Sequence, residues 1–413
     1  MNVKSGLLGE KLSHSYSPEI HAELGAYPYR LFEVEPENVE RFLFEGDFTG
    51  INVTIPYKKT VLPYMDEVSD TVKATGSVNT VLKRKDGSFY GDNTDVYGFT
   101  QLVLKSGIDA GGKKALVLGS GGSSLSVVAA LKKLGANVVV ISRSGENNYQ
   151  NLHLHRDARL IVNTTPLGMY PNNGAKALSL KSFDRPEGVI DLIYNPSRTA
   201  LMLEADEMGI PAENGLYMLV AQAKRSSELF CASTIPDSET ERIYRLLSRR
   251  MRNIALIGMP GSGKSTAAEN LSRITGRPVL DCDAEFTRRY GNTPAEVIRL
   301  RGESAFRELE TQILSDLSKH SAAIISTGGG CVTREENYRL LRQNSVTVWL
   351  SRELKHLSVA GRPLSQAKGV ESLYSERAPL YERFADVSVE VQAKPTDTAS
   401  RILSALDEME AAK

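Results

Sequence analysis

Short apolar runs alternate with longer amphipathic stretches along this chain, in two successive series. In the first series we expect strands at 115–119, 137–142, 159–165 and 188–194, with crossover helices at 125–134 and 198–208. In the second series we expect strands at 253–258, 278–281, 322–327, 346–351 and 387–391. Such alternation is typical of βαβ units, whose strands form parallel sheets. Each series can bury a core of its own, so the sequence predicts an α/β fold with two separate modules.

The stretch Ala232–Arg252 marks the boundary between the two series. It contains a proline and small polar residues at Ser233–Ser238, and then a charged segment that runs directly into the strand expected at Asn253. A chain of 413 residues also exceeds the roughly 250–300 residues at which single cores stop growing. We therefore expect a short, helical linker between two modules.

Composition narrows the class of protein. Apolar residues make up 41% of the chain and charged residues 24%, which is ordinary globular usage. Fifty basic residues balance fifty acidic ones, so no net field attracts nucleic acid or an anionic membrane. The three cysteines form no CxxC pair, and the sequence has neither a signal-type apolar core nor a membrane-spanning run. We expect a soluble cytoplasmic protein without nucleic-acid or membrane partners.

A glycine-rich turn follows the first strand of the second series. It reads GMPGSGKS from Gly258 to Ser265, the GxxxxGK[ST] pattern of a P-loop. Its backbone N–H groups can face phosphate oxygens, while Lys264 reaches the terminal phosphates and the Ser265 hydroxyl ligates Mg²⁺. The helix that follows directs its positive end at the same anion. The pattern predicts a site for ATP and Mg²⁺ formed by Gly261, Ser262, Gly263, Lys264, Ser265 and Thr266.

Five further segments follow the P-loop. In chain order they are DCD (281–283), GESAFRELE (302–310), STGGG (326–330), GRPL (361–364) and ERAPLYE (376–382). We expect the strand at 278–281 to end in DCD, whose two carboxylates would take two different roles. An arginine and a glutamate three residues apart, Arg307 and Glu310, share one helical face, so the acid can orient the base.

Together these segments resemble the motifs of shikimate kinase over residues 252–406. The resemblance implies that Asp281 assists the Mg²⁺ shell and that Asp283 binds the acceptor hydroxyls and takes the proton from the attacking one. It implies that Arg362 is a lid arginine that closes over the phosphates. It implies an acceptor site formed by Arg307, Gly329, Gly330 and Arg377, in which the arginines hold a carboxylate.

The first series also begins with a glycine-rich turn between a strand and a helix. This turn has the position and the glycine content of a dinucleotide-binding turn. It consists of Gly119, Ser120, Gly121, Gly122 and Ser123. The next strand ends in Ile141-Ser142-Arg143-Ser144, with no acidic residue to receive a ribose 2′-hydroxyl. Arg143 and the two hydroxyls favour a 2′-phosphate, so we expect NADP(H) rather than NAD(H).

Four motifs around this turn resemble those of shikimate dehydrogenase, over residues 3–232. They are LSHSYSPEIH (12–21), NVTIPYK (52–58), GSVNT (76–80) and GDNTD (91–95). The resemblance implies that Lys58 and Asp95 form the catalytic pair and that Thr165 and Met169 lie beside the cofactor. It implies a substrate site formed by Ser15, Ser17, Thr54, Asn79, Tyr194 and Gln222.

The paired carboxylate and ammonium fit the expected chemistry. Hydride arriving at a ketone carbon leaves an alkoxide, so a proton donor is needed beside that oxygen. Lys58 can supply the proton, and Asp95 can hold the lysine side chain in place. The resemblances imply a substrate domain at 1–97 with 215–245 returning, a Rossmann domain at 98–214 and a kinase domain at 246–413.

We therefore expect a bifunctional enzyme, a monomer or homodimer, whose partners are small molecules. It would reduce 3-dehydroshikimate to shikimate with NADPH and phosphorylate shikimate with MgATP. Two alternatives stay open. One is a quinate/shikimate dehydrogenase fused to a kinase for another small hydroxylated acid. The other is that one module is a nucleotide-binding regulatory domain without catalysis.

Overall fold

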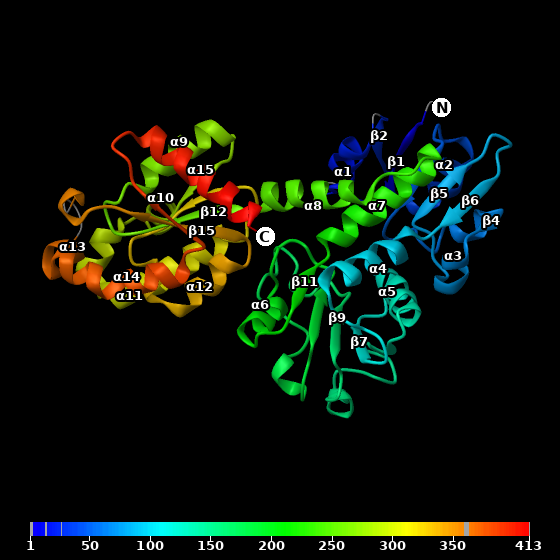
Figure 1. Ribbon diagram of the computed structural model, residues 1–413, viewed down its shortest axis with the longest axis horizontal. Helices are drawn as coiled ribbons and strands as arrows, with labels where there is room; N and C mark the ends of the chain where they lie inside the picture. Colours follow the sequence, from blue (N-terminus) through cyan, green and yellow to red (C-terminus); the bar gives the residue numbers. More distant parts are fainter. Residues whose placement is uncertain (1–2, 13–14, 26, 359–362, 413) are drawn as a thin grey trace. The chain divides into compact units, whose positions relative to one another are not determined.

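The computed structural model describes residues 3–12, 15–25, 27–358 and 363–412. Its chain groups into two compact units (Figure 1). The first comprises Met1–Tyr194 and Thr199–Ser248, and the second comprises Asn195–Arg198 and Arg249–Lys413. The fold is α/β throughout, as the alternating pattern predicts.

The N-terminal part of the first unit contains a six-stranded mixed sheet. Its strands, in spatial order, are β2 (Tyr29–Glu33), β1 (Ser5–Gly9), β3 (Gly50–Val53), β5 (Thr80–Lys83), β6 (Phe89–Asp92) and β4 (Glu67–Val68). The strand β5 runs antiparallel to both β3 and β6, and the other neighbours are parallel. The helices of this part are α1 (Ser17–Leu24), α2 (Val39–Glu45) and α3 (Asp70–Thr75). Apolar side chains of α2 and α3 join the strands in one core.

The second sheet of this unit is fully parallel. Its strands, in spatial order, are β11 (Ala212–Asn214), β10 (Gly188–Asp191), β9 (Leu160–Asn163), β7 (Lys114–Leu118) and β8 (Asn137–Ile141). The helices α4 (Thr94–Ser106) and α5 (Gly122–Lys133) pack on one face, and α6 (Ala200–Glu207) packs on the other. Because both faces are covered, β7, β9 and β10 read as nearly continuous runs of Val, Leu and Ile. The helix α7 (Leu216–Cys231) then returns to the first sheet, where Phe230 lies against Gly50 of β3.

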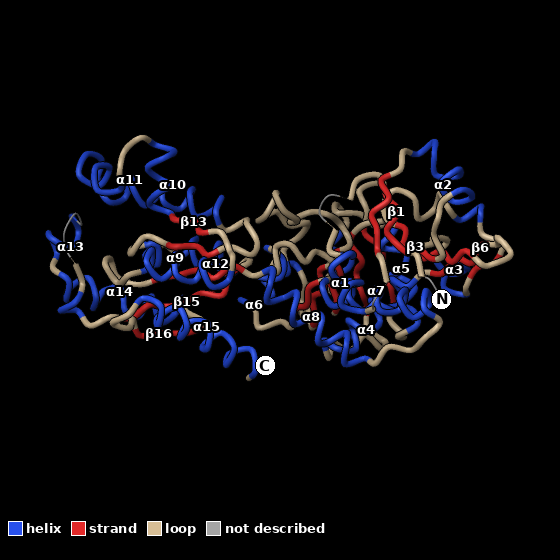
Figure 2. Tube along the Cα trace, turned by 90° about the horizontal axis from the view of Figure 1, so that it is seen from above, coloured by secondary structure: helices blue, strands red, loops and turns tan. Residues whose placement is uncertain are grey.

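The second unit is a three-layer sandwich around one parallel sheet. Its strands, in spatial order, are β13 (Val279–Asp281), β14 (Ile324–Ser326), β12 (Asn253–Ile257), β15 (Ser345–Ser351) and β16 (Val387–Glu390). The helices α9 (Lys264–Thr275) and α15 (Pro395–Ala411) cover one face. The other face is covered by α10 (Cys282–Tyr290), α11 (Pro294–Leu317), α12 (Glu335–Arg342) and α14 (Val370–Phe384), with the short α13 (Pro363–Lys368) before α14. Figure 2 shows the helices and strands of this unit in a second view.

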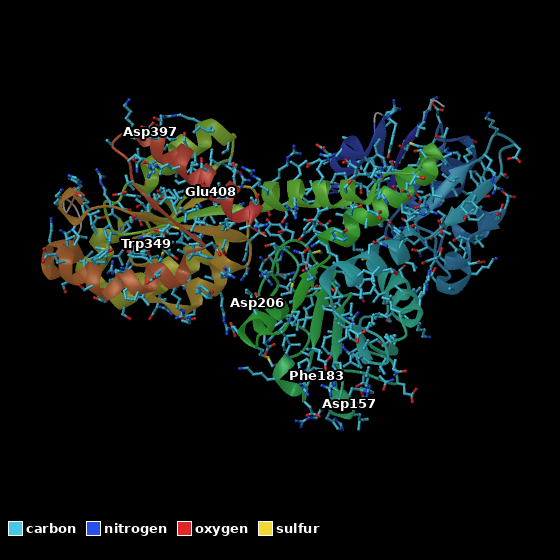
Figure 3. All side chains as sticks on the ribbon, in the orientation of Figure 1. Asp157, Phe183, Asp206, Trp349, Asp397 and Glu408 are labelled. Atoms are coloured by element: carbon cyan, nitrogen blue, oxygen red, sulfur yellow. The ribbon has the colours of Figure 1, made fainter. Side chains whose placement is uncertain are left out.

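The sequence contains one tryptophan, Trp349, and it lies on β15 (Figure 3). Its ring stacks on Tyr381 of α14, with 5.8 Å between ring centroids. Tryptophan emission therefore reports on the second unit alone.

The predicted linker is helical. The helix α8 spans Asp237–Met251 and leads to β12. In the first unit, Tyr244 of α8 packs edge-on against Tyr217 of α7, and Arg242 pairs with Glu23. Among the described residues, no helix has both the length and the apolar character needed to cross a membrane.

One expectation about local structure is wrong. The strand β13 ends at Asp281, and Asp283 lies in the first turn of α10 rather than on the strand. The Asp281 carboxylate accepts hydrogen bonds from the backbone N–H groups of Asp283 (3.0 Å) and Ala284 (3.1 Å). Asp281 is thus the N-cap of α10, and capping starts the helix where the strand was expected to continue. The two carboxylates therefore lie on different elements, one at the end of β13 and one in the first turn of α10.

Candidate active sites

The first unit brings a lysine and an aspartate from distant motifs into contact. Lys58 follows β3, and Asp95 lies in the first turn of α4. The Lys58 Nζ lies 2.6 Å from Asp95 Oδ2, and the side chains are only 15% and 10% exposed. Removal from water strengthens the attraction between the two charges, so the pair has a fixed geometry. The pair lies at the wall of a hollow.

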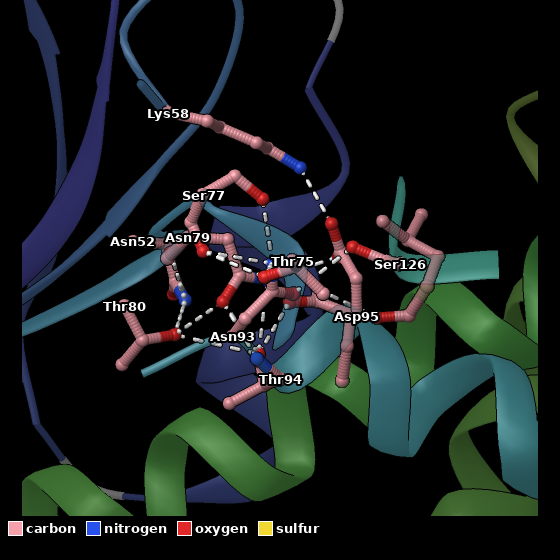
Figure 4. Close-up of polar contacts among 12 residues, drawn as sticks. Asn52, Lys58, Thr75, Ser77, Asn79, Thr80, Asn93, Thr94, Asp95 and Ser126 are labelled. Carbon is pink, nitrogen blue, oxygen red and sulfur yellow. Dashed lines mark hydrogen bonds and ion pairs between the residues drawn. The ribbon is translucent and has the colours of Figure 1, made fainter. Parts of the chain in front are cut away.

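Asn79 holds the other oxygen of the same carboxylate (Figure 4). Its Nδ2 donates to Asp95 Oδ1 at 2.9 Å and to Thr94 Oγ1 at 3.1 Å. Its Oδ1 accepts from the backbone N–H of Thr94 at 2.7 Å and from Thr80 Oγ1 at 3.0 Å. The Asn79 amide therefore makes a full set of hydrogen bonds with protein groups and orients Asp95 toward Lys58.

Behind Asn79 lies a buried layer of hydroxyl and amide groups. The hydroxyl of Ser226, on α7, accepts from Asn52 Nδ2 at 2.7 Å and lies 3.0 Å from both Thr80 Oγ1 and Thr94 Oγ1. Sequence reasoning missed Thr80, Thr94 and Ser226. Thr80 and Thr94 lie within the motifs GSVNT and GDNTD, which gave them no role of their own, and Ser226 follows Gln222 by one helical turn.

A hollow of about 680 Å³ collects the site residues expected for reduction. Its lining includes all eight residues expected in the catalytic pair and the substrate site, and two expected near the cofactor: Ser15, Ser17, Thr54, Lys58, Asn79, Asp95, Tyr194 and Gln222, with Ser123 and Met169. Burial raises the pKa of Tyr194, so this phenol stays neutral at physiological pH. Gln222 turns its Nε2 to the backbone oxygen of Leu219 at 2.9 Å.

The dinucleotide-type turn lies between β7 and α5. Gly119, Ser120 and Gly121 precede the helix, and Gly122 and Ser123 form its first residues. A Cβ atom on Gly119 would lie 3.0 Å from Thr165 Cγ2, so the bare backbone allows the two loops to approach. Arg143 follows β8 and is exposed. Its positive charge partly offsets the rise that burial causes in the pKa of Tyr149. The backbone N–H groups at the start of α5 can face an anion such as a pyrophosphate.

In the second unit the P-loop joins β12 to α9. Gly263 takes a positive φ of 95°, which a side chain would disfavour, and Lys264 begins the helix. The Lys264 Nζ donates to the backbone oxygens of Gly258 (3.0 Å) and Met259 (3.1 Å). The ammonium group therefore lies within the loop, and it can exchange these carbonyls for phosphate oxygens.

A hydroxyl and a carboxylate adjoin the start of α9. Ser265 Oγ donates to Asp281 Oδ2 at 2.9 Å and lies 3.4 Å from Ser326 Oγ. Magnesium usually takes one or two protein oxygens and completes its shell with phosphate oxygens and water. Ser265 and Asp281 provide that donor set, so the residues fit a nucleotide-bound Mg²⁺. No cluster of three or more His, Cys, Asp or Glu side chains suited to a metal occurs within the described ranges.

The side chain of Asp283 has a raised pKa. Its carboxyl group lies in the wall of the second unit's hollow, and its pKa is raised to about 6. Burial is the main cause, followed by repulsion from Glu310 and Asp281, while Lys264 and Arg307 act in the opposite direction. A carboxylate with this pKa can accept a proton near neutral pH.

Two buried arginines complete this hollow. Arg307 Nη1 donates to Glu310 Oε2 at 2.7 Å, the i, i+3 pair expected from the sequence. Arg377 Nη1 donates to the backbone oxygen of Gly329 at 3.2 Å. A Cβ atom on Gly330 would overlap the Arg307 guanidinium, so a glycine is required beside it.

The hollow has a volume of about 440 Å³. Its lining brings together most of the expected site residues: Gly261, Gly263, Lys264, Ser265, Thr266, Asp281, Asp283, Arg307, Gly329, Gly330 and Arg377. Ser262 belongs to the same loop and is fully buried. Arg362, the expected lid arginine, lies outside the described residues. Sequence reasoning also missed Arg352, which lines the hollow, and Tyr381, whose hydroxyl donates to the Gly329 oxygen.

Comparison with known proteins assigns a family to each part. The family described as shikimate kinase matches residues 260–407, and the family described as shikimate dehydrogenase substrate binding domain matches residues 7–81. A shikimate dehydrogenase (NADP(+)) of Clostridium perfringens (strain SM101 / Type A) is 36% identical over 267 residues, which are 59% of this chain and 98% of the relative.

Two solved structures agree with this comparison. A chorismate mutase/shikimate 5-dehydrogenase fusion protein from Clostridium acetobutylicum has 34% identity and a TM-score of 0.57, and the match covers 60% of this chain and 98% of that one. Shikimate 5-dehydrogenase from Thermus thermophilus, solved with NADP(H) and shikimate, has 31% identity and a TM-score of 0.55, with 59% and 99% covered.

Proposed function

Because the chain belongs to the shikimate dehydrogenase family and carries a shikimate kinase domain toward its C-terminal end, we propose that it catalyses two consecutive reactions. The first unit reduces 3-dehydroshikimate to shikimate with NADPH. The second unit phosphorylates shikimate to shikimate 3-phosphate with ATP. The observation that carries the proposal is that one chain holds both the Lys58–Asp95 pair and a P-loop beside two buried arginines. The product of the first reaction is the substrate of the second.

In the reduction, bound NADPH would supply the hydride for the carbonyl carbon of the substrate. Lys58, as an ammonium, gives a proton to the carbonyl oxygen, and the hydroxyl of shikimate results. Asp95 keeps the lysine oriented through the 2.6 Å contact, and Asn79 holds Asp95 from the other side. Ser15, Ser17, Thr54, Tyr194 and Gln222 line the same hollow and bind the rest of the substrate.

The cofactor of the reduction is NADP(H). The turn at 119–123 and the start of α5 receive the pyrophosphate, with Thr165 and Met169 beside the cofactor. Arg143 and its neighbours Ser142 and Ser144 receive the 2′-phosphate. A guanidinium donates charge-assisted hydrogen bonds to phosphate, so the pair is stronger than neutral contacts would be.

In the phosphorylation, the acceptor hydroxyl attacks the terminal phosphorus of ATP. Asp283 binds that hydroxyl and accepts its proton, for which a pKa of about 6 is well placed. Lys264 neutralises charge on the transferring phosphoryl group, and we assign the same task to Arg362. Arg307 and Arg377 hold the acceptor carboxylate, with Gly329 and Gly330 against the ring. A Mg²⁺ ion at Ser265 and Asp281 would neutralise phosphate charge.

The state of the cysteines bears on where in the cell the enzyme is located. All three cysteines are unpaired thiols, and two of them are buried. Reduced thiols support a cytoplasmic location. We propose a monomer or homodimer whose partners are small molecules, without nucleic acid or membrane.

Separate assays of the two reactions test this proposal. We expect the purified chain to oxidise NADPH when 3-dehydroshikimate is added, and to release ADP when shikimate and MgATP are added. Faster turnover of quinate with NAD⁺ than of shikimate with NADP⁺ would contradict the first assignment. An active P-loop unit that ignores shikimate and phosphorylates another hydroxy acid would contradict the second.

A further inference from the structure

A glutamate with no role in the proposed chemistry lies among the groups that hold the acceptor. Glu303 follows a break in α11, where Gly302 has φ 86° and ψ 165°, a conformation outside the helical region. The positive φ favours glycine, so the break is specified by the sequence. Glu303 is the first residue after the break, and its side chain is 30% exposed.

One oxygen of this glutamate faces both arginines. Glu303 Oε1 lies 3.1 Å from Arg307 Nη2 and 3.6 Å from Arg377 Nη2. The two arginines come from α11 and α14, and their side chains are 8% and 1% exposed. A carboxylate that bridges two buried guanidinium groups occupies the position expected for the carboxylate of a bound acid.

The arginines retain capacity for more acceptor oxygens. Within the part of the chain that the structure describes, Arg307 Nε, Arg377 Nε and Arg377 Nη2 are buried and make no hydrogen bond. Buried guanidinium donors without acceptors are costly. A ligand carboxylate with two oxygens would satisfy more of these donors than the single Glu303 oxygen does.

The balance of charges determines whether the Glu303 carboxylate and the acceptor carboxylate can both lie at the arginine pair. The cluster now contains two guanidinium charges, from Arg307 and Arg377, and two carboxylates, from Glu303 and Glu310. The same hollow also contains the acidic Asp283 and the cations Lys264 and Arg352. At the arginine pair itself, the two resident carboxylates already balance the two guanidinium charges, so an acceptor carboxylate that entered beside both of them would meet like charge.

Glu303 is the resident carboxylate that can leave. Glu310 is 3% exposed and hydrogen-bonded to Arg307, whereas Glu303 is partly exposed and lies beside the break at Gly302. We propose that Glu303 is an internal competitor for the acceptor carboxylate: it neutralises the arginine pair in the empty site, and the incoming acid displaces it toward solvent. This inference rests on the proposed phosphorylation of shikimate.

A Glu303→Gln variant of the full chain tests the proposal. The amide no longer neutralises the arginines, so the KM for shikimate and its dissociation constant without nucleotide are expected to fall by about two- to fivefold, the range for one partly exposed ion pair. The change falls on KM rather than kcat. Glu308→Gln is the matched control, because Glu308 is an exposed glutamate on the same helix outside the hollow. It is expected to leave both constants unchanged.

The methyl ester of shikimate separates competition from a general effect on the site. The ester lacks the negative charge, so its KM is expected to be the same in the wild-type chain and in Glu303→Gln. If the variant folds poorly, Glu303→Asp, which retracts the carboxylate by one methylene group, is expected to lower the KM for shikimate by a smaller factor. Unchanged emission from Trp349, which lies in the second unit, establishes that this unit is folded in the variant.

Three outcomes overturn the inference. A higher KM for shikimate in Glu303→Gln would mean that Glu303 positions the arginines for the substrate. An unchanged KM would mean that there is no competition, and an equal fall for the ester would mean that the carboxylate is not involved. If the wild-type chain does not phosphorylate shikimate at all, the proposed function itself has failed, which is a different result.

Discussion

The chemistry proposed for each unit depends on a small number of charged side chains that are withdrawn from water. Lys58 and Asp95 are joined at 2.6 Å with little exposure, and Arg307 is joined to Glu310 at 2.7 Å. In the first pair Asn79 holds Asp95, and in the second the glycine run 328–330 leaves space for the Arg307 and Glu310 side chains. The fixed partner determines where the reactive or binding cation points.

Asp283 leads to a prediction about pH. Its pKa is raised from 3.8 to about 6, and the carboxylate is the form that accepts the proton. The sign follows directly: above pH 6 the base is available, and below pH 6 the group is protonated. We expect kcat/KM for phosphorylation of shikimate to fall about tenfold per pH unit below about pH 6.

The measurement is a pH profile of ADP release. A rate that stays flat down to about pH 4.5, as an ordinary aspartate would give, would contradict the role of Asp283 as the base. In Asp283→Asn the phosphorylation rate is expected to be reduced about 100- to 10,000-fold at every pH, while NADPH oxidation is retained.

Arg143 leads to a prediction about the cofactor. Removing its guanidinium in Arg143→Ala is expected to raise the KM for NADPH by about 10- to 100-fold, the range for a charge-assisted hydrogen bond. The KM for NADH should change little, because NADH has no 2′-phosphate. Steady-state kinetics with both cofactors measures the two KM values in the wild-type chain and in the variant. An equal rise in the KM for NADH would mean that Arg143 binds a part of the cofactor that NADPH and NADH share.

At the scale of elements, most strands of the two parallel sheets were predicted but their ends were not, and the strands of the six-stranded mixed sheet were not predicted. Buried parallel strands consist largely of Val, Ile and Leu, which is why those beginning near residues 115, 160, 188 and 253 can be recognised in the sequence. Asp281 shows why an end is harder to place. Its side chain caps α10 and so moves Asp283 onto a helix, a choice made by two hydrogen bonds rather than by a pattern.

The site residues divide in a similar way. Glycine-rich turns and charged motif residues could be found from their spacing, because their chemistry needs those residue types. Thr80, Thr94 and Ser226 could not be found, because hydroxyl residues are common and Ser226 meets Thr80 across 146 positions of sequence. Glu303 was within a recognised motif, but its contact with Arg377 depends on how α11 and α14 pack.

The start of α11 leads to a prediction about stability. Thr293 and Glu296 form a capping box: Thr293 Oγ1 accepts from the Glu296 N–H at 3.3 Å, and the Glu296 carboxylate accepts from the Thr293 N–H at 2.7 Å. Thr293→Ala is expected to destabilise the second unit by about 1 kcal/mol.

Trp349 makes this effect measurable in the full chain, since the emission of the single tryptophan reports the second unit. Unfolding in urea is expected to shift to lower concentration for Thr293→Ala. Ser375→Ala is the control, because this exposed hydroxyl lies inside α14 and donates only to the preceding turn. Equal shifts for both variants would contradict a specific capping role.

At the scale of the molecule, the two units have separate sheets and separate hollows. Each has its own nucleotide-binding turn and its own acid–base or charge-neutralising group. The residues that line one hollow are absent from the lining of the other. Inactivation of one unit should therefore leave the chemistry of the other intact.

The most direct test is a coupled assay with two single variants, Lys58→Ala and Lys264→Ala. The wild-type chain, given 3-dehydroshikimate, NADPH and MgATP, is expected to form shikimate 3-phosphate. Lys58→Ala should lose reduction by about 100- to 10,000-fold but still phosphorylate added shikimate, and Lys264→Ala should accumulate shikimate. Mixing the two variants should restore shikimate 3-phosphate. Loss of both reactions from either substitution would contradict two independent sites in one chain.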